Sequence, residues 1–168
     1  MIRVGVLGPE STGKSTLCKQ LAEQYGYHWI KEYAREYVEN LGRSYTYDDV
    51  LCIGRRQIAE LQAEYSEPVV LYDTELILTK VWMEHVYGKV ADEVTQAIQK
   101  QPMDMYLILA PDLPAEPDPV RENLDKREYF YQWYIREVEA TRRPYYIISG
   151  KGAERTQAAY EAIQKNRL

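Results

Sequence analysis

The strongest constraint on the fold of this chain is the stretch GPESTGKS, residues 8–15. It satisfies the pattern GxxxxGK[ST], which forms a phosphate-binding loop when a strand precedes it and a helix follows it. The apolar run IRVGVLG precedes the loop, and KSTLCKQLAEQY follows it with Leu17, Leu21 and Tyr25 repeating every four residues. The sequence therefore predicts a strand, a phosphate loop and a helix in succession.

The side chains of this loop predict how a nucleoside triphosphate is held. Glycines let successive backbone N–H groups turn toward phosphate oxygens, and the helix N-terminus adds a partial positive charge. Lys14 is predicted to contact the β- and γ-phosphates, and Ser15 to join the coordination of Mg²⁺. The predicted ATP-binding residues of the loop are Gly8, Glu10, Ser11, Thr12, Gly13, Lys14, Ser15 and Thr16.

The length and charge of the chain limit its function classes. Its 168 residues fit one domain, 1–168, and its formal net charge of -5 argues against a nucleic-acid groove. The sequence shows no secretory signal pattern and no apolar run of membrane-spanning length, so we expect a cytoplasmic protein with a small-molecule partner and no membrane contact. Its oligomeric state stays open. We expect Cys18 and Cys52 to be buried, reduced thiols.

Apolar runs alternate with helical patterns along the whole chain. The expected strands lie within 2–8, 27–32, 68–74, 105–111 and 144–150. The expected helices cover 14–25, 32–41, 47–65, 75–87, 90–101, 123–142 and 153–166. This alternation predicts an α/β fold with a mostly parallel sheet of five strands.

A proline-rich segment follows the fourth expected strand. Residues 110–123 read APDLPAEPDPVREN, with four prolines, and we expect a lid-like loop over about 110–127. Arg121 from this loop is predicted to stabilise the charge of a transferring phosphoryl group, with Arg127 close behind in sequence. Asp112 and Asp118 are candidates to orient that arginine or to bind ribose hydroxyls. The alternative is an ordinary solvated loop.

The third expected strand ends in an acid. Asp73 closes the buried run VVLYD, the position of a Mg²⁺-organising carboxylate downstream of a phosphate loop. The alternative is an aspartate that starts a turn or caps the following helix. Thr74 follows instead of a second acid, which favours phosphoryl transfer to a substrate over hydrolysis.

Charged residues also follow the second and fifth expected strands. In KEYAREY, Glu32 is the candidate base for an acceptor hydroxyl and Arg35 a candidate to steady negative charge, with a solvated ion-pair cluster as the alternative. Whether Glu32 or Asp73 is the general base stays open. In SGKGAER, Arg155 is the candidate adenine contact, with a plain strand-to-helix turn as the alternative.

Together these segments resemble the ribosylnicotinamide kinase domain of NadR-type proteins. The shared features are GPESTGKSTL, EYAREY, DTELILTKVWMEHVYG, YLILAPDLP with DPVRE behind it, and SGKGAER, in this order. The resemblance implies a nucleotide-kinase-like three-layer α/β/α sandwich. It also implies ATP- and Mg²⁺-dependent phosphorylation of nicotinamide riboside to its mononucleotide for NAD salvage.

The chain departs from this family at its lid. The family reads Pro-Asp-x-Pro-Trp followed by Asp-Gly-x-Arg, whereas Ala115 replaces the tryptophan here and Pro119 replaces the glycine. Trp82 and Tyr33 are candidate stacking faces for the acceptor base, although a helical tryptophan is more often a core residue. The full set of predicted acceptor-binding residues is Glu32, Tyr33, Arg35, Asp73, Trp82 and Asp118.

Two alternative functions share the phosphate loop. One is a kinase of another nucleoside or nucleotide, and the sequence also leaves the choice between ATP and GTP open. The other is a nucleotide-binding sensor or switch, because phosphate loops serve many functions on one fold. A guanine-specific switch normally carries an NKxD-like base-reading motif, and neither LILAPD nor IISGKG supplies one.

Overall fold

A five-stranded parallel sheet forms the centre of the computed structural model, which describes residues 1–100, 102–120 and 122–167. The strands are β1 (Ile2–Leu7), β2 (His28–Ile30), β3 (Val69–Asp73), β4 (Met105–Leu109) and β5 (Tyr145–Ile148). Their order in the sheet is β2-β3-β1-β4-β5, and every pairing is parallel. The three-layer α/β/α sandwich predicted from the sequence is confirmed.

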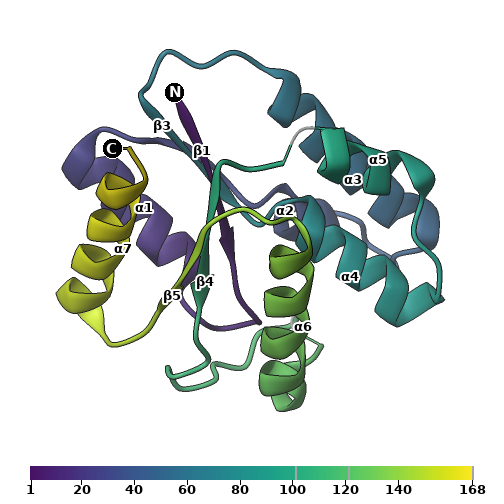
Figure 1. The fold of residues 1–168 in the computed structure, drawn as a ribbon. Coiled ribbons are helices and arrows are strands. Elements are labelled where there is room, and N and C mark those ends of the chain that lie inside the picture. The colour runs from purple at the N-terminus through teal and green to yellow at the C-terminus, as the bar shows by residue number, and fades with distance from the viewer. Residues whose placement is uncertain (101, 121, 168) are drawn as a thin grey trace.

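Helices connect the strands and cover both faces of the sheet. They are α1 (Lys14–Tyr25), α2 (Tyr33–Glu39), α3 (Tyr47–Gln62), α4 (Leu76–Tyr87), α5 (Asp92–Lys100), α6 (Arg127–Ala140) and α7 (Gly152–Arg167), with a short 3-10 helix, η1 (Leu124–Lys126). Helices α1 and α7 lie on one side of the sheet, and α2 to α6 lie on the other (Figure 1). None of the described helices is long and apolar enough to cross a bilayer.

The strands have apolar residues on both faces because helices bury both. Val4 and Val6 belong to the core beneath α1 and α7. Leu7 and Tyr72 belong to the core beneath α3 to α6. Alternation along β3 therefore places Asp73 on the same face as Leu71, the face that carries α1.

One cysteine prediction is wrong. Cys18 is buried as expected, but Cys52 is exposed. In α3 the buried positions include Val50, Ile53 and Gln57, so Cys52 falls on the opposite, solvent-facing side of that helix.

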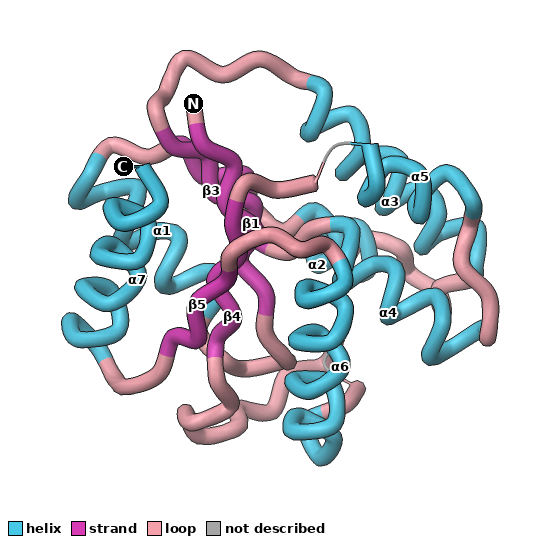
Figure 2. The backbone as a smooth tube through the Cα atoms, viewed as in Figure 1, coloured by secondary structure: helices cyan, strands magenta, loops and turns pink. Residues whose placement is uncertain are grey.

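All loops that leave the carboxyl ends of the strands lie at one edge of the sheet. Figure 2 shows the connections from β1 to α1 and from β4 to η1 next to each other at the lower end of the sheet. Ligands of open parallel sheets bind at this edge. The predicted site residues are drawn mainly from these connections.

Candidate functional site

The phosphate loop joins β1 to α1 and has the backbone shape that its glycines predict. Gly8 and Gly13 have φ angles of 156° and 80°, and a Cβ atom at Gly8 would lie 3.0 Å from the carbonyl oxygen of Leu109. The hydroxyl of Thr12 donates to the carbonyl of Pro9 at 2.8 Å, inside the loop. The N-cap residue of α1 is Gly13, which has no side chain to cap the N–H groups of the first turn.

Lys14 spans this loop from the start of α1. Its Nζ donates to the carbonyl oxygens of Gly8 at 3.0 Å and Pro9 at 3.2 Å. The ammonium group therefore lies at the mouth of the loop, where phosphate oxygens would replace neutral carbonyls as its partners. The role of Lys14 as a phosphate contact stays a prediction.

Asp73 meets Ser15 at the end of β3. The hydroxyl of Ser15 donates to Oδ2 of Asp73 at 2.6 Å, and the indole N–H of Trp29 donates to the same oxygen at 3.3 Å. Oδ1 of Asp73 is buried and has no hydrogen-bond partner among the residues that the structure describes. Burial raises the pKa of Asp73, partly opposed by the Ser15 hydrogen bond and by Lys14.

The hydroxyl oxygen of Ser15 and the carboxylate of Asp73 fit a Mg²⁺ ion as ligands. An unpartnered buried carboxylate oxygen gains a partner when a cation or a cation-bound water lies beside it. No group of three His, Cys, Asp or Glu side chains with metal-binding geometry occurs in the described part of the chain. Ser15 and Asp73 would therefore share the ion with phosphate oxygens and water, which is how Mg²⁺ is held in nucleotide sites.

The turn after Asp73 is strained. Thr74 has a φ of 69°, a region that β-branched residues rarely adopt, and its N–H donates to the carbonyl of Val6 at 3.2 Å. Glu75 then caps α4 by accepting the N–H of Ile77 at 2.9 Å. Burial raises the pKa of Glu75 to about 8. This turn fixes the start of the helix that carries Trp82.

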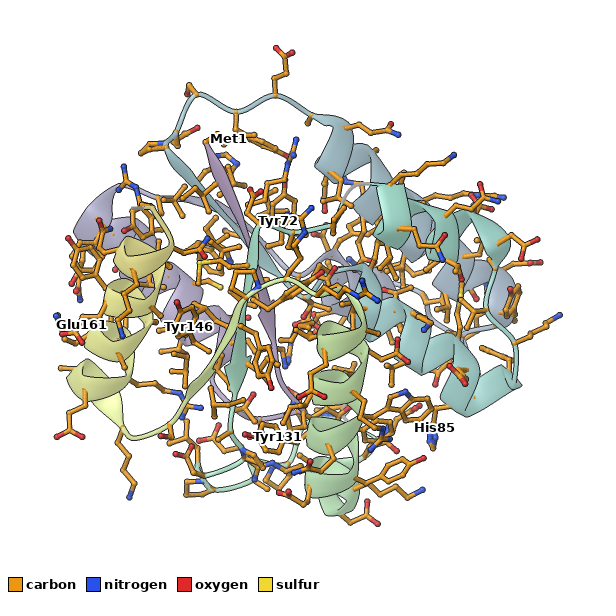
Figure 3. All side chains as sticks on the ribbon, viewed as in Figure 1. Met1, Tyr72, His85, Tyr131, Tyr146 and Glu161 are labelled. Atoms are coloured by element: carbon orange, nitrogen blue, oxygen red, sulfur yellow. The ribbon has the colours of Figure 1, made fainter. Side chains whose placement is uncertain are left out.

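A pocket of about 240 Å³ extends from the phosphate loop to a wall of apolar and aromatic side chains. Trp82 is part of this wall, and the ring of Tyr45 meets it edge-on with centroids 4.9 Å apart. His85, labelled in Figure 3, lies where α4 approaches α6. The wall residues from α2, the segment before α3, α4 and α6 are Ala34, Val38, Tyr45, Leu78, Val81, Trp82, His85, Phe130 and Tyr134.

Most of these wall residues were not predicted from the sequence as site residues. Leu78, Val81, Trp82 and His85 follow the spacing i, i+3, i+4 and i+7, which marks one face of a helix but does not reveal whether that face lines a pocket or the core. Trp29 was also missed, and its contact with Asp73 depends on the pairing of β2 with β3.

The site residues predicted after the second strand do not all line the pocket. Glu32 and Arg35 line the pocket, and Arg35 forms ion pairs with Asp118 and with Glu39. The Asp118 side chain raises the pKa of Arg35 by hydrogen bonding. Tyr33 is not among the lining residues of the pocket, because its ring packs against Tyr37 and the Arg56 guanidinium instead.

The proline-rich segment lies against the phosphate loop. The Glu10 carboxylate accepts the backbone N–H groups of Glu122 at 3.3 Å and Asn123 at 3.0 Å. The hydroxyl of Ser11 accepts the N–H of Glu116 at 2.9 Å, and Arg127 donates to the carbonyl of Ser11 at 3.3 Å. Glu10, predicted to bind ATP, therefore binds the proline-rich segment here. Arg121 lies outside the described residues.

Arg155 borders a second cavity of about 320 Å³ on the other side of the phosphate loop. Its guanidinium donates to Asp112 at 3.0 Å and to the carbonyls of Gly150 and Ala110, each at 3.2 Å. Asp112 also accepts the N–H of Gly150 at 2.7 Å. Arg155 and Asp112 therefore tie together the segments that follow β4 and β5, at the border of this cavity.

A family model and several known proteins match this chain. A family model described as an AAA domain matches residues 3–155. Over 135 residues, the chain is 27% identical to the trifunctional NAD biosynthesis/regulator protein NadR of Escherichia coli, covering 75% of this chain and 33% of that protein. The NadR protein of Salmonella typhimurium is 27% identical over 124 residues, 70% of this chain and 30% of the relative. The chain thus spans about a third of the length of these curated relatives.

Solved structures share the fold. The crystal structure of a NadR protein in complex with NR superposes with a TM-score of 0.81 at 24% identity and covers 98% of this chain and 51% of that one. A deoxyadenosine kinase from M. mycoides with bound dATP gives a TM-score of 0.69 at 11% identity, covering 98% and 100% of the two chains. The chain therefore shares its fold with the NadR protein and the deoxyadenosine kinase, the resemblance to NadR is confirmed, and the chain belongs to the AAA domain family.

Proposed function

We propose that this protein transfers the γ-phosphoryl group of ATP to the 5′-hydroxyl group of nicotinamide riboside and so forms nicotinamide mononucleotide. The observation that carries the proposal is the pocket that joins the phosphate loop to the wall around Trp82. Such a pocket can hold a planar base against the wall while the attached ribose reaches toward a phosphate beside Lys14. The NadR structure in complex with NR supports this choice of acceptor.

The residues of the proposed mechanism act on the donor, on the acceptor or on the proline-rich segment. Lys14 and the loop N–H groups hold the β- and γ-phosphates, and Ser15 and Asp73 hold Mg²⁺. The ion, when bound, would neutralise charge on the phosphate oxygens. Arg121, whose position is not described, is proposed to act on the transferring group. Trp82 flanks the acceptor base, and the Arg35–Asp118 pair holds the proline-rich segment close to α2.

Glu32 is the proposed base for the acceptor. The 5′-hydroxyl oxygen attacks the γ-phosphorus, its proton passes to the Glu32 carboxylate, and ADP leaves. Glu32→Gln is expected to lower kcat about a hundredfold with a small change in KM. A larger loss in Asp73→Asn at saturating Mg²⁺, with Glu32→Gln near wild type, would make Asp73 the base instead.

The proposed function is tested by supplying the chain with ATP, Mg²⁺ and a panel of nucleosides and nucleotides. Mass spectrometry is expected to show the mononucleotide of nicotinamide riboside as the main product. If another nucleoside is converted and nicotinamide riboside is not, the acceptor is wrong while phosphoryl transfer stands. Tight nucleotide binding without turnover of any acceptor would favour a sensor or switch.

A further inference from the structure

Two carboxylates that line the pocket, those of Glu10 and Glu122, are not used by the proposed mechanism, and Glu10 already accepts two backbone N–H groups. Oε2 of Glu122 accepts a hydrogen bond from the hydroxyl of Tyr45 at 2.8 Å. The backbone N–H of Glu122 donates to Glu10 at 3.3 Å. Because Tyr45 packs against Trp82, these contacts hold the Glu122 carboxylate at the wall end of the pocket.

The charges that line this pocket are distributed unevenly. Lys14 lies at the phosphate loop, and Arg35 is already paired with Asp118 and Glu39. Within the described residues, no ion pair joins Glu122 to a lysine, arginine or histidine, and its hydrogen-bond donor is a neutral phenol. The wall end of the pocket therefore carries a negative charge without a cationic partner from the described chain.

Tyr45 is suited to keep this carboxylate in place. Burial, together with the nearby Glu122, raises the pKa of Tyr45 to about 12, so its hydroxyl remains a donor across the neutral range. The edge-on contact with Trp82 fixes the Tyr45 ring from the other side. Glu122 is thus held by the Tyr45 hydroxyl, and the ring of Tyr45 contacts Trp82, the candidate stacking residue for a base.

We infer that Glu122 selects acceptor nucleosides whose base carries a fixed positive charge over nucleosides with a neutral base. This inference rests on the proposed function, in which the base binds against Trp82. A cationic ring gains an attraction to the Glu122 carboxylate and to the Trp82 face, whereas a neutral ring gains only stacking. The attraction grows as the base displaces water from the pocket, because the effective dielectric constant falls.

The test compares two nucleosides that differ mainly in the charge of the base. Nicotinamide riboside has a pyridinium cation, and dihydronicotinamide riboside has the same sugar and carboxamide on a neutral ring. The wild-type protein is expected to prefer the cation in kcat/KM, and Glu122→Gln is expected to reduce that preference about tenfold through the KM of the cation. Tyr45→Phe, which removes the hydrogen-bond donor to Glu122, should also reduce the preference for the cation, but by a smaller factor.

Glu23→Gln is the matched control. It makes the same change in net charge at an exposed position of α1 outside the pocket, and it should leave the preference unchanged. Thermal unfolding checks that each variant is folded. An unaltered preference in Glu122→Gln would overturn the inference.

Calorimetric binding of both nucleosides separates this inference from the proposed function. If neither nucleoside is phosphorylated but the cation binds more tightly in the wild type and not in Glu122→Gln, charge selection stands and the proposed acceptor fails. Equal affinity of the wild type for the two nucleosides would overturn the inference even if both are phosphorylated.

Discussion

The two ends of the pocket are built in different ways. At the phosphate end, eight consecutive residues, 8–15, supply the loop and its lysine, and Asp73 and Trp29 join them from β3 and β2. At the wall end, α2, α4 and α6 each contribute side chains, together with Tyr45 and Glu122. Binding at the phosphate end therefore depends on charge and backbone shape, while binding at the wall end depends on packed apolar surface. Substitutions at the two ends should have different kinetic effects.

The largest effect is expected for Lys14→Ala. Removing the ammonium group takes away charge stabilisation that matters most in the transition state, so kcat should fall by about a thousandfold or more. Within the described part of the chain, the Lys14 ammonium group donates only to carbonyls of the loop, so the melting temperature should change by only a few degrees. Steady-state kinetics with thermal unfolding check both statements. A large rise in KM at unchanged kcat would contradict the role.

Asp73→Asn should have the next largest effect at the same end. We expect kcat to fall about a hundredfold and the Mg²⁺ concentration for half-maximal rate to rise, because a neutral amide binds the ion less well. The melting temperature should hold or rise, since burial already disfavours the charged carboxylate at this position. A melting temperature several degrees lower would show that the Ser15–Asp73 hydrogen bond stabilises the fold instead.

Trp82→Ala tests the wall end. Loss of the stacking face should raise KM for the acceptor about twentyfold and leave kcat and the KM for ATP nearly unchanged. Trp82→Phe, which keeps an aromatic face, should retain most of the affinity. If Trp82→Ala lowers kcat as strongly as Lys14→Ala does, the division between the two ends is wrong.

The last prediction concerns stability and not activity, through Glu75, which caps the helix of the wall. Its pKa of about 8 in the folded protein exceeds the ordinary value of 4.5, so the folded state binds an extra proton between these pH values. Stability should therefore fall as the pH rises from about 5 to 8, by at most about 1.4 kcal/mol per pH unit.

Chemical unfolding at several pH values tests this pH dependence. Glu75→Gln keeps an oxygen for the Ile77 N–H and should flatten the slope. Glu84→Gln, an exposed change on the same helix, should not alter the slope. Equal slopes in wild type and Glu75→Gln would show that Glu75 does not titrate in this range.

Local sequence patterns were enough to predict the strands and helices that form the layers of the fold. The apolar runs around residues 2–8 and 68–74 predicted β1 and β3 closely, because a strand buried on both faces leaves a continuous apolar signal. Helix α1 begins and ends where its pattern predicts, since Lys14 follows the loop and Gly26 ends the helix with a left-handed conformation. Cys52 was misplaced although the spacing of its buried neighbours already indicated an exposed position.

Contacts between distant segments were harder to predict. Arg35 was expected near the acceptor, and its pairing with Asp118, 83 residues away, appears only in the folded chain. Glu10 belongs to the phosphate motif, yet its carboxylate binds the N–H groups of Glu122 and Asn123. Tyr33 was expected to stack on a base but lies outside the pocket with its ring against Tyr37.

The sequence by itself determined the phosphate loop, the alternation of strands and helices, and the acid at the end of β3, because each depends on neighbouring residues and on repeats of two or about four. Only the tertiary structure decided which aromatic side chains form the wall, that Trp29 and Ser15 share one oxygen of Asp73, and that Glu122 lies beside Tyr45. These contacts join residues from different elements. Their distances follow from how helices pack on the sheet, which no local pattern records.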